Sequence, residues 1–493
     1  MKWRAFVLLA FAAGAARAGA QTLPRSTPEE QGVSSAGLLS FVQAADEQIE
    51  GMNSFLLVRH GHVVAEGYWS PYDAASRHSL YSLTTSFTST AVGLAIADGK
   101  MGLYDPVLPQ FPDDAPAEAS DNLKAMRVRD LLTMSTGHHA EATFTADDVW
   151  LRQFLAQPVV HKPGSFFLYN TPATNTLAAL VRKAVGENVL DYLRPRLFAP
   201  LGITDPDWGL NPQGVSIGGF GLSLRTDEIA RFGQLLLQRG EWHGRQLVPA
   251  AWVEAATARQ MSNGSNPDCD WEQGYGFQFW RCRHRAYRGD GAFGQFCVVL
   301  PEEDAVVAIT SGVKSMQAVL NLVWDRLLPA LSAEGLPEDA ATREKLRATL
   351  GRLTMPMPRT AALPAAKPKA TGRTFAFPEN EQKLKTVSLE RKGDAVTLVA
   401  RFGGAEQRVV CGRGEWRKGR LAYGTPDEQA VAASGAWTAP DTYTARLVFY
   451  ETPFNLTLTL RFAGEQLFYD AEYNVAFKQT KLAQIVGTAA PAK

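Results

Sequence analysis

A Ser/Thr-rich stretch around residue 82 is the first candidate for chemistry in this chain. Tyr81 and Ser82 end a polar segment, and apolar residues then recur at helical spacing until Gly99. Ser82 is therefore expected at a helix N-terminus, where free N–H groups and the helix dipole favour developing negative charge. Position 85 lies one turn later on the same side. A lysine there would act as the base for a nucleophilic serine, but the residue is threonine.

The same stretch also has a structural interpretation. Serine and threonine are favoured as helix N-caps, and a run of such small polar residues suits a packing face. Thr85 is too short and too weak a base to take a proton from Ser82. Taken alone, the pattern does not separate a nucleophile from a helix cap.

Two later segments could complete a site around Ser82. Tyr169 precedes a helical pattern that ends at Gly186, and a tyrosine held beside a charge-stabilising site can act as a base. Residues 288–295 contain Gly-Asp-Gly and lead directly into a strand pattern. Glycines at a strand edge let a substrate approach the backbone and leave an N–H group for an oxyanion. An aromatic anchor and a simple hairpin turn are the alternative interpretations.

The order of the expected elements predicts the scaffold that must hold these groups. Strand patterns occur at 55–58 and 63–68, joined by a turn at His60-Gly61-His62, and return at 296–300 and 305–310. Helical patterns fill the middle, and a last helix is expected at 317–331. This order predicts an antiparallel sheet built from both ends of one domain, with an all-helical insertion between them.

A Pro/Ala-rich segment then interrupts the pattern. Four prolines fall between residues 354 and 372, with little apolar periodicity, which indicates a linker. Beyond it the signal is almost purely that of strands, as at 395–402, 443–450 and 456–462. Residues 373–487 are predicted to form a small β-barrel or sandwich.

Composition and the N-terminal residues limit the class of protein. The 493 residues are 45% hydrophobic and 20% charged, and 50 basic side chains balance 50 acidic ones. This suits a globular protein of more than one domain and implies neither a nucleic acid nor an anionic membrane as partner. Residues 1–20 carry Lys2 and Arg4, an apolar run and a small-residue cleavage site, the pattern of a secretory signal.

The apolar run in this leader is shorter than the ~20 residues that a membrane anchor needs, so a cleaved signal is the favoured interpretation. Its removal takes away Lys2, Arg4 and Arg17 and leaves 47 basic against 50 acidic residues. We therefore expect a periplasmic or secreted protein with no membrane span.

The cysteines and histidines suggest no metal site. Cys269 and Cys282 could pair across a short loop in an exported protein, but the sequence does not establish any pairing among these two, Cys297 and Cys411. No spacing of cysteine and histidine resembles a zinc site. The pair His138-His139 is interpreted as structural, and neither a metal nor another cofactor is expected.

Read together and in this order, the segments resemble the serine β-lactamase and penicillin-binding-protein superfamily, particularly its β-lactamase-related esterases, which are close to class C β-lactamases. The resemblance runs over residues 30–330, and its matching stretches are 78–93, 128–138, 169–170, 198–202 and 290–294. It implies an α/β (α+β) domain at 21–350, with an antiparallel sheet flanked by helices and a helical lobe. The linker at 351–372 and the all-β domain at 373–487 follow.

The resemblance also implies roles for single residues. Ser82 would be the acyl-accepting nucleophile, Tyr169 would assist proton transfer, and the N–H groups of Ser82 and Ala292 would bind the oxyanion. The family's lysine position is occupied by Thr85. The remaining substrate-binding positions would be Asn170, Thr171, Asp290 and Gly291.

Two further positions depart from the family pattern. Thr171 stands where an asparagine is usual, although Asn170 is adjacent. Gly289 stands where a cationic residue is usual, with Arg288 and Arg285 as candidate substitutes.

The expected function is that of an exported serine hydrolase acting through an acyl-serine. Carboxylic esters are the first substrate class and β-lactam or peptide amides the second, with cell-wall-related compounds among the candidates. General-base assistance is worth about 10² to 10⁴ in rate, so without the lysine we expect slow reaction with activated esters. Two alternatives remain: an inactive binding protein of the same fold, and a structural envelope protein that associates through its β-domain.

Overall fold

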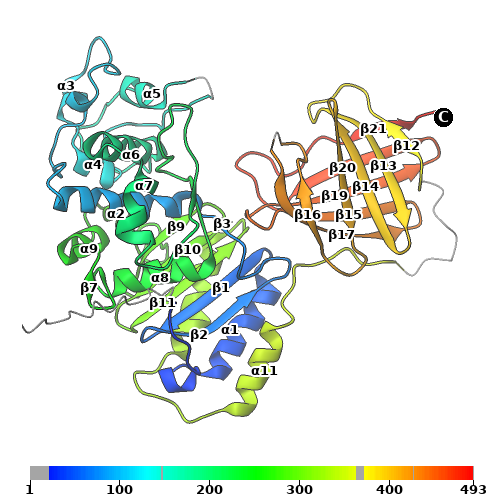
Figure 1. Cartoon of the computed structure of the whole chain (residues 1–493), viewed down its shortest axis with the longest axis horizontal. Helices are drawn as coiled ribbons and strands as arrows, with labels where there is room; N and C mark the ends of the chain where they lie inside the picture. The colour runs from blue at the N-terminus through cyan, green and yellow to red at the C-terminus, as the bar shows by residue number, and fades with distance from the viewer. Residues whose placement is uncertain (1–21, 146–147, 362–370, 426, 492–493) are drawn as a thin grey trace, which may run out of the picture.

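The computed structural model describes residues 22–145, 148–361, 371–425 and 427–491, which fold into two domains (Figure 1). The predicted signal peptide, residues 1–20, lies outside the described residues, as does part of the predicted linker at 351–372. The predicted domain boundaries therefore stay predictions. Among the described helices, none combines the length and the apolar character that crossing a membrane requires.

A six-stranded antiparallel sheet forms the centre of the first domain, in the order β2-β1-β11-β10-β9-β8. Met52 in β1 pairs with Ser311 in β11, which confirms that the sheet is built from both ends of the domain. Four of its strands are buried along their whole length, because helices cover both faces. The strands are β1 (Met52–Arg59), β2 (His62–Tyr68), β8 (Trp280–Arg281), β9 (Tyr287–Gly291), β10 (Gln295–Leu300) and β11 (Ala305–Ser311).

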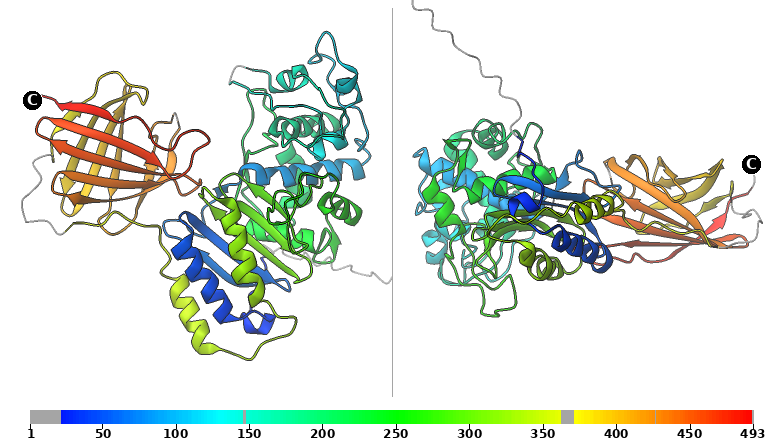
Figure 2. Two further views of the ribbon diagram at one scale, coloured as in Figure 1. Left: turned by 180° about the vertical axis from the view of Figure 1, so that it is seen from behind. Right: turned by 90° about the horizontal axis from the view of Figure 1, so that it is seen from below.

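The two faces of this sheet contact different helices (Figures 1 and 2). Alternate residues of β1 point to opposite sides, so Phe55 joins one apolar core and Leu56 the other. One face is covered by α1 (Ser35–Gln48), α10 (Met316–Leu322) and α11 (Ala340–Leu350), and the other by α8 (Thr226–Leu237). The helix predicted at 317–331 is confirmed as α10 and two further turns, η5 (Val323–Leu327) and η6 (Leu328–Ala330).

The residues between β2 and β8 form a mainly helical lobe, at whose base α2 (Thr84–Ala97) packs against α6 (Thr171–Val185). Its other helices are α3 (Asp121–Ala125), α4 (Val128–Leu132), α5 (Trp150–Ala156), α7 (Val189–Leu193), the π-helical turn η4 (Arg194–Phe198) and α9 (Ala250–Thr257).

The prediction of an all-helical insertion is wrong in one respect, because the lobe also contains five short strands. One small sheet has the order β3-β5-β4 and one ribbon pairs β6 with β7. Strands of two or three residues are too short for an alternating pattern to show in a sequence. They are β3 (His78–Ser79), β4 (Asp207–Trp208), β5 (Leu222–Leu224), β6 (Glu241–Trp242) and β7 (Arg245–Gln246).

The second domain confirms the predicted all-β fold. Ten antiparallel strands follow the order β15-β14-β13-β12-β21-β20-β19-β18-β17-β16, and a bridge between Gly412, just after β15, and Ser434 on β17 gives a nearly closed barrel. Its strands are β12 (Thr374–Ala376), β13 (Leu384–Lys392), β14 (Ala395–Phe402), β15 (Ala405–Cys411), β16 (Arg417–Leu421), β17 (Gln429–Ala439), β18 (Thr442–Val448), β19 (Asn455–Ala463), β20 (Gln466–Tyr473) and β21 (Ile485–Ala489).

Two loops of the β-domain contact the first domain close to residue 82. In the β18–β19 loop, the carbonyl of Glu451 accepts a hydrogen bond from the Ser79 N–H at 2.9 Å. In the β20–β21 loop, the side-chain amide of Asn474 donates to the carbonyl of Gly312 at 2.9 Å. The second domain therefore touches both the segment before Ser82 and the segment after β11.

Candidate active site

Ser82 lies in a single 3₁₀ turn, η2 (Tyr81–Leu83), that leads directly into α2. Tyr81 has φ = 48°, a left-handed conformation that costs a non-glycine residue about 1–3 kcal/mol. The N–H of Leu83 bonds the carbonyl of Leu80, and that of Thr84 bonds Tyr81. Among the described residues no acceptor pairs with the N–H of Ser82. The structure thus places Ser82 at the helix N-terminus, as predicted.

The Ser/Thr-rich stretch does not cap α2. No side chain accepts a hydrogen bond from the first turn of this helix, so the capping interpretation of Ser82 is wrong. The buried hydroxyls further along α2 instead bind neighbouring loops: Ser86 donates to the carbonyl of Gln278 at 2.9 Å and Thr88 to that of Gly218 at 2.8 Å. These bonds fix α2, and with it Ser82, to the rest of the lobe.

Tyr169 lies on the loop before α6 with its hydroxyl toward Ser82 and Thr85. Burial raises the pKa of Tyr169 above its ordinary value of 10.0, and the negative charge of Asp290 adds to this effect. Polar contacts with Ser82 and Thr85 lower the pKa only in part. Tyr169 therefore keeps its proton at neutral pH, and it can donate a hydrogen bond more readily than it can accept a proton.

A second tyrosine, Tyr275, also has its hydroxyl toward Thr85. It is fully buried, its hydroxyl makes no hydrogen bond of normal geometry with any described residue, and burial raises its pKa well above the ordinary value. The ring of Trp280 stacks on Tyr169 with centroids 5.5 Å apart and meets Tyr275 edge-on at 4.8 Å. Two protonated phenols therefore lie beside the position where the resemblance implies an amine.

The backbone of β9 lies directly against η2. A Cβ atom on Gly291 would stand 1.9 Å from the carbonyl oxygen of Leu80 and 3.1 Å from the nitrogen of Ser82, so only glycine fits there. The turn that follows carries Ala292, whose N–H likewise has no acceptor among the described residues. Gln295 fixes this turn by donating to the carbonyl of Ala292 at 3.0 Å. Two backbone N–H groups thus lie on adjoining segments, as an oxyanion site requires.

Asp290 does not stand free for a substrate. It is only 6% exposed, and one carboxylate oxygen accepts a hydrogen bond from the Nε of Arg288 at 2.8 Å, with Arg288 itself completely buried. Burial raises the pKa of Asp290, and the guanidinium of Arg288 opposes that shift. The interpretation of Asp290 as a substrate contact is therefore corrected to that of a buried partner of Arg288.

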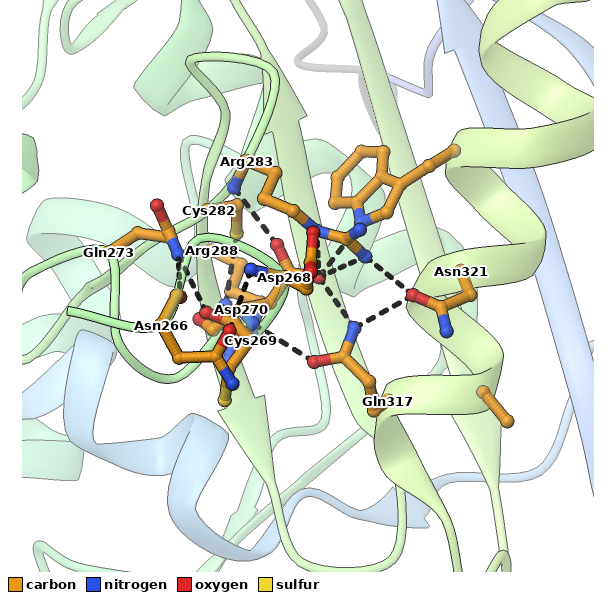
Figure 3. A network of polar contacts seen from close by, with 12 residues as sticks. Asn266, Asp268, Cys269, Asp270, Gln273, Cys282, Arg283, Arg288, Gln317 and Asn321 are labelled. Carbon is orange, nitrogen blue, oxygen red and sulfur yellow. Dashed lines mark hydrogen bonds and ion pairs between the residues drawn. The ribbon is translucent and has the colours of Figure 1, made fainter. Parts of the chain in front are cut away.

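A polar network behind β9 holds Arg288 in place (Figure 3). Arg288 donates to the carbonyl of Asp270 at 2.8 Å, and its guanidinium lies over the ring of Trp271. The carboxylate of Asp270 accepts hydrogen bonds from Arg283 and Gln317 at 2.9 and 2.6 Å. Burial alone would raise the pKa of Asp270, but these donors together lower it, so Asp270 is ionised at neutral pH.

Neither candidate substitute for the missing cation reaches the site. Arg285 is 80% exposed at a surface turn and pairs with Glu302. Arg288 is engaged by Asp290 and the Asp270 carbonyl. No group of three or more potential metal ligands occurs among the residues that the structure describes.

Asn170 supports the site rather than lining it. Its side chain is completely buried and caps α6 by accepting a hydrogen bond from the N–H of Ala173 at 3.3 Å. Thr171 is half-buried at the first position of α6, and its N–H donates to the carboxylate of Glu141 at 2.7 Å. Asn170 followed by a proline in the first helical turn is a recognisable capping pattern, so this role could have been found in the sequence.

The remaining predictions concern histidines and cysteines. His138 is buried and contacts the hydroxyl of Thr136 at 2.8 Å, consistent with a structural role. The turn at residues 60–61 joins β1 to β2 as predicted. All four cysteines are free, so Cys269 and Cys282 are not paired.

Two buried residues that support the site were missed in the sequence. Tyr275 is one, and Gln278 is the other: its side-chain oxygen accepts from Thr174 on α6 and its amide donates to the carbonyl of Leu131. Gln278 has φ = 65°. No pattern marks either residue, because both lie in irregular backbone between α9 and β8.

An antiparallel sheet flanked by helices, with a serine at the start of a buried helix, a tyrosine facing it and a glycine strand beside it, defines the β-lactamase and penicillin-binding-protein class. Residues 39–320 match the family model described as Beta-lactamase, and the chain belongs to that family. The resemblance seen in the sequence is confirmed.

Known relatives agree with this assignment. The 6-aminohexanoate-dimer hydrolase of Paenarthrobacter ureafaciens is 24% identical over 57% of this chain and 78% of its own length. A candidate 6-aminohexanoate-dimer hydrolase from Bacillus anthracis superposes with a TM-score of 0.51 at 19% identity, covering 64% of this chain and 89% of its own. A penicillin-binding protein homologue from Caulobacter crescentus gives 0.50 at 17% identity, covering 60% and 97%. These structures share the fold of the first domain.

Proposed function

We propose that this protein is an exported serine hydrolase that forms an acyl-enzyme at Ser82 with carboxylic esters. The observation that supports this most is the placement of Ser82: its N–H, at the start of α2, finds no acceptor in the described part of the chain, the backbone of Gly291 lies beside it, and the hydroxyl of Tyr169 faces it. Membership of the family also supports the proposal, because relatives with a named reaction include a hydrolase. The predicted leader, which lies outside the described residues, is the basis for export.

The proposed reaction has two steps. The hydroxyl oxygen of Ser82 attacks the ester carbonyl carbon, the N–H groups of Ser82 and Ala292 hold the oxyanion, and the C–O bond to the alcohol breaks. Tyr169 donates its proton to the departing alkoxide and takes the serine proton in return. Water then releases the acid from Ser82 by the reverse proton path.

The raised pKa of Tyr169 sets the order of substrates. A protonated phenol stabilises a leaving group but removes the serine proton slowly, so activated esters should react first and unactivated amides last. The name of the Paenarthrobacter relative adds one amide to examine, the 6-aminohexanoate dimer. A cell-wall-related ester or amide stays within the same proposal.

Covalent labelling tests this proposal. Incubation with a fluorescent alkyl phosphonate followed by intact-mass measurement should show one adduct on the wild type and none on Ser82→Ala. Ser79→Ala is the matched control, since it removes a half-buried hydroxyl three residues earlier that has no hydrogen-bond partner among the residues described. Absence of an adduct, together with absence of nitrophenyl acetate turnover above the Ser82→Ala level, would refute the enzyme proposal.

A second candidate is a binding protein of the same fold, favoured by Thr85 and by the two protonated phenols beside it. The two candidates differ in what Thr85→Lys should do. An amine at position 85 would face Tyr169 and Tyr275, so an otherwise intact site should gain about 10² in labelling rate or more. If labelling stays at the wild-type level in a folded Thr85→Lys protein, the result favours the binding protein over the enzyme.

A further inference from the structure

Four aromatic rings from the two domains meet beside the candidate nucleophile. We call Tyr81, Phe293, Phe454 and Phe477 the interdomain aromatic cluster. Tyr81 contacts Phe293, Phe454 and Phe477 with centroids 5.9, 6.3 and 5.7 Å apart, and Phe293 contacts Phe477 at 4.7 Å. The first two residues belong to the first domain, and the other two belong to loops of the β-domain.

The position of this cluster follows from the chain on either side. Tyr81 immediately precedes Ser82, and Phe293 immediately follows Ala292, so each of the two proposed oxyanion donors has a cluster residue as its neighbour. The backbone of both residues is fixed in a left-handed conformation, with φ of 48° and 66°. Two strained residues flanking one site indicate that the directions of their side chains matter there.

Phe477 is the unusual member. The residue is 70% exposed, although its ring contacts those of Tyr81 and Phe293, and it is the most exposed large apolar residue among those described. The base of its loop is closed by a bridge between Glu472 and Lys481 and by the bond from Asn474 to Gly312. The ring is therefore held at the site by an anchored loop, with one face left for a ligand.

Contacts other than those of Phe477 hold the two domains together. The contacts of Glu451 with Ser79, of Thr452 with Tyr72 and of Asn474 with Gly312 hold the loops without it. A phenylalanine that is mostly exposed contributes little buried area to such an interface. An apolar ring that is fixed, exposed and next to a reactive site instead suits contact with substrate.

We propose that Phe477, together with Tyr81 and Phe293, forms the wall that receives an apolar group of the ester at Ser82, so that the β-domain sets substrate preference. This inference rests on the proposed function and deepens it: the substrate class is esters that carry a sizeable hydrocarbon or aromatic group. None of the four rings carries a charge at neutral pH, which suits such a group and disfavours an ionic one.

Two ester series test the proposal and distinguish the acyl side from the alcohol side. The acyl series compares 4-nitrophenyl octanoate with 4-nitrophenyl acetate, and the alcohol series compares 4-nitro-1-naphthyl acetate with 4-nitrophenyl acetate. For wild type and Phe477→Ala, kcat/KM is measured on each. We expect Phe477→Ala to lower the large-to-small ratio about tenfold in one series, mainly through KM, because the larger ester loses more contact with the wall than the acetate does. The series that changes identifies the group that the wall receives.

Phe468→Ala is the matched control, since it truncates a phenylalanine on β20 of the same domain whose ring contacts Arg461. It should leave both ratios at the wild-type value. Unchanged ratios in Phe477→Ala, or an equal loss on all esters, would overturn the proposal, and a lowered melting temperature with unchanged ratios would assign Phe477 to domain packing. Absence of Ser82-dependent turnover in the wild type would instead show that the proposed function has failed, and this wall with it.

Discussion

Substituting Gly291 by alanine should disable the candidate site while leaving the fold intact. The added Cβ would stand 1.9 Å from the carbonyl oxygen of Leu80, whereas real Cβ contacts essentially never fall below 3.0 Å. Either β9 or η2 must therefore move by about 1 Å, and a misplacement of that size costs about 10²-fold in a positioned reaction. We expect the rate of phosphonate labelling at Ser82 to fall about 100-fold. Overpacking should also lower the free energy of unfolding by about 1–3 kcal/mol.

The assay for Gly291→Ala separates the two effects. The labelling rate is taken from intact-mass time courses, and urea titration by circular dichroism gives the free energy of unfolding of the same samples. Gly419→Ala on β16 is the control, because a Cβ there would meet nothing within 4 Å, and it should change neither quantity. If folded Gly291→Ala labels within threefold of the wild type, the close placement of β9 against Ser82 is not what supports reactivity.

Three further predictions concern stability. Burial lowers the pKa of His78 from 6.5 to about 4, so below pH 6.5 the unfolded chain binds a proton at this residue that the native state does not bind. The free energy of unfolding therefore has its full value above pH 6.5 and falls as the pH drops toward 4, by about 2 kcal/mol at pH 5. Urea titrations at pH 7.5 and 5.0 should show this loss in the wild type and not in His78→Asn. Arg288→Met should cost about 3–5 kcal/mol because it leaves Asp290 buried without its partner, and a double variant with Asp290→Asn should recover part of this; equal stability of single and double variants would contradict the pairing. Asn474→Ala removes three hydrogen bonds, one of them to the first domain, and should separate the calorimetric transitions of the two domains. Asn380→Ala is the control, because it also removes three hydrogen bonds but only within the β-domain; it should lower the melting temperature of one transition without separating the two. A single unchanged transition in Asn474→Ala would mean that this bond does not couple the domains.

The fold was predictable where a local pattern reports burial. The strand expected at 395–402 is β14 to the residue, because it has one face in the barrel core and alternates accordingly. The end of α2 was visible from Gly99, which adopts φ = 67°. The strands of the helical lobe were not, since two or three residues carry no period.

The positions of the site residues along the backbone could be predicted from the sequence, but the surroundings of its charged side chains could not. The positions of Ser82, Tyr169 and Gly291 on their elements were predicted correctly, whereas Asp290 was expected to bind the substrate and Arg288 was one of two candidate substitutes for the missing cation. Charged residues beside glycines suggest a surface turn, and nothing local reveals that Asp270 and two tryptophans close over this pair. The chemical roles of Ser82, Tyr169 and Ala292 stay predictions.

The pairing of β1 with β11 has a consequence for how the two domains reach their native state. The residues of the whole helical lobe lie between Met52 and Ser311 in the sequence, so pairing these two strands closes a long loop at a large entropic cost. Most strands of the barrel instead pair with their neighbours along the chain, from β13 to β15 and from β16 to β21. Because folding slows as contacts become more distant in sequence, the barrel should form first and the domain that carries Ser82 last.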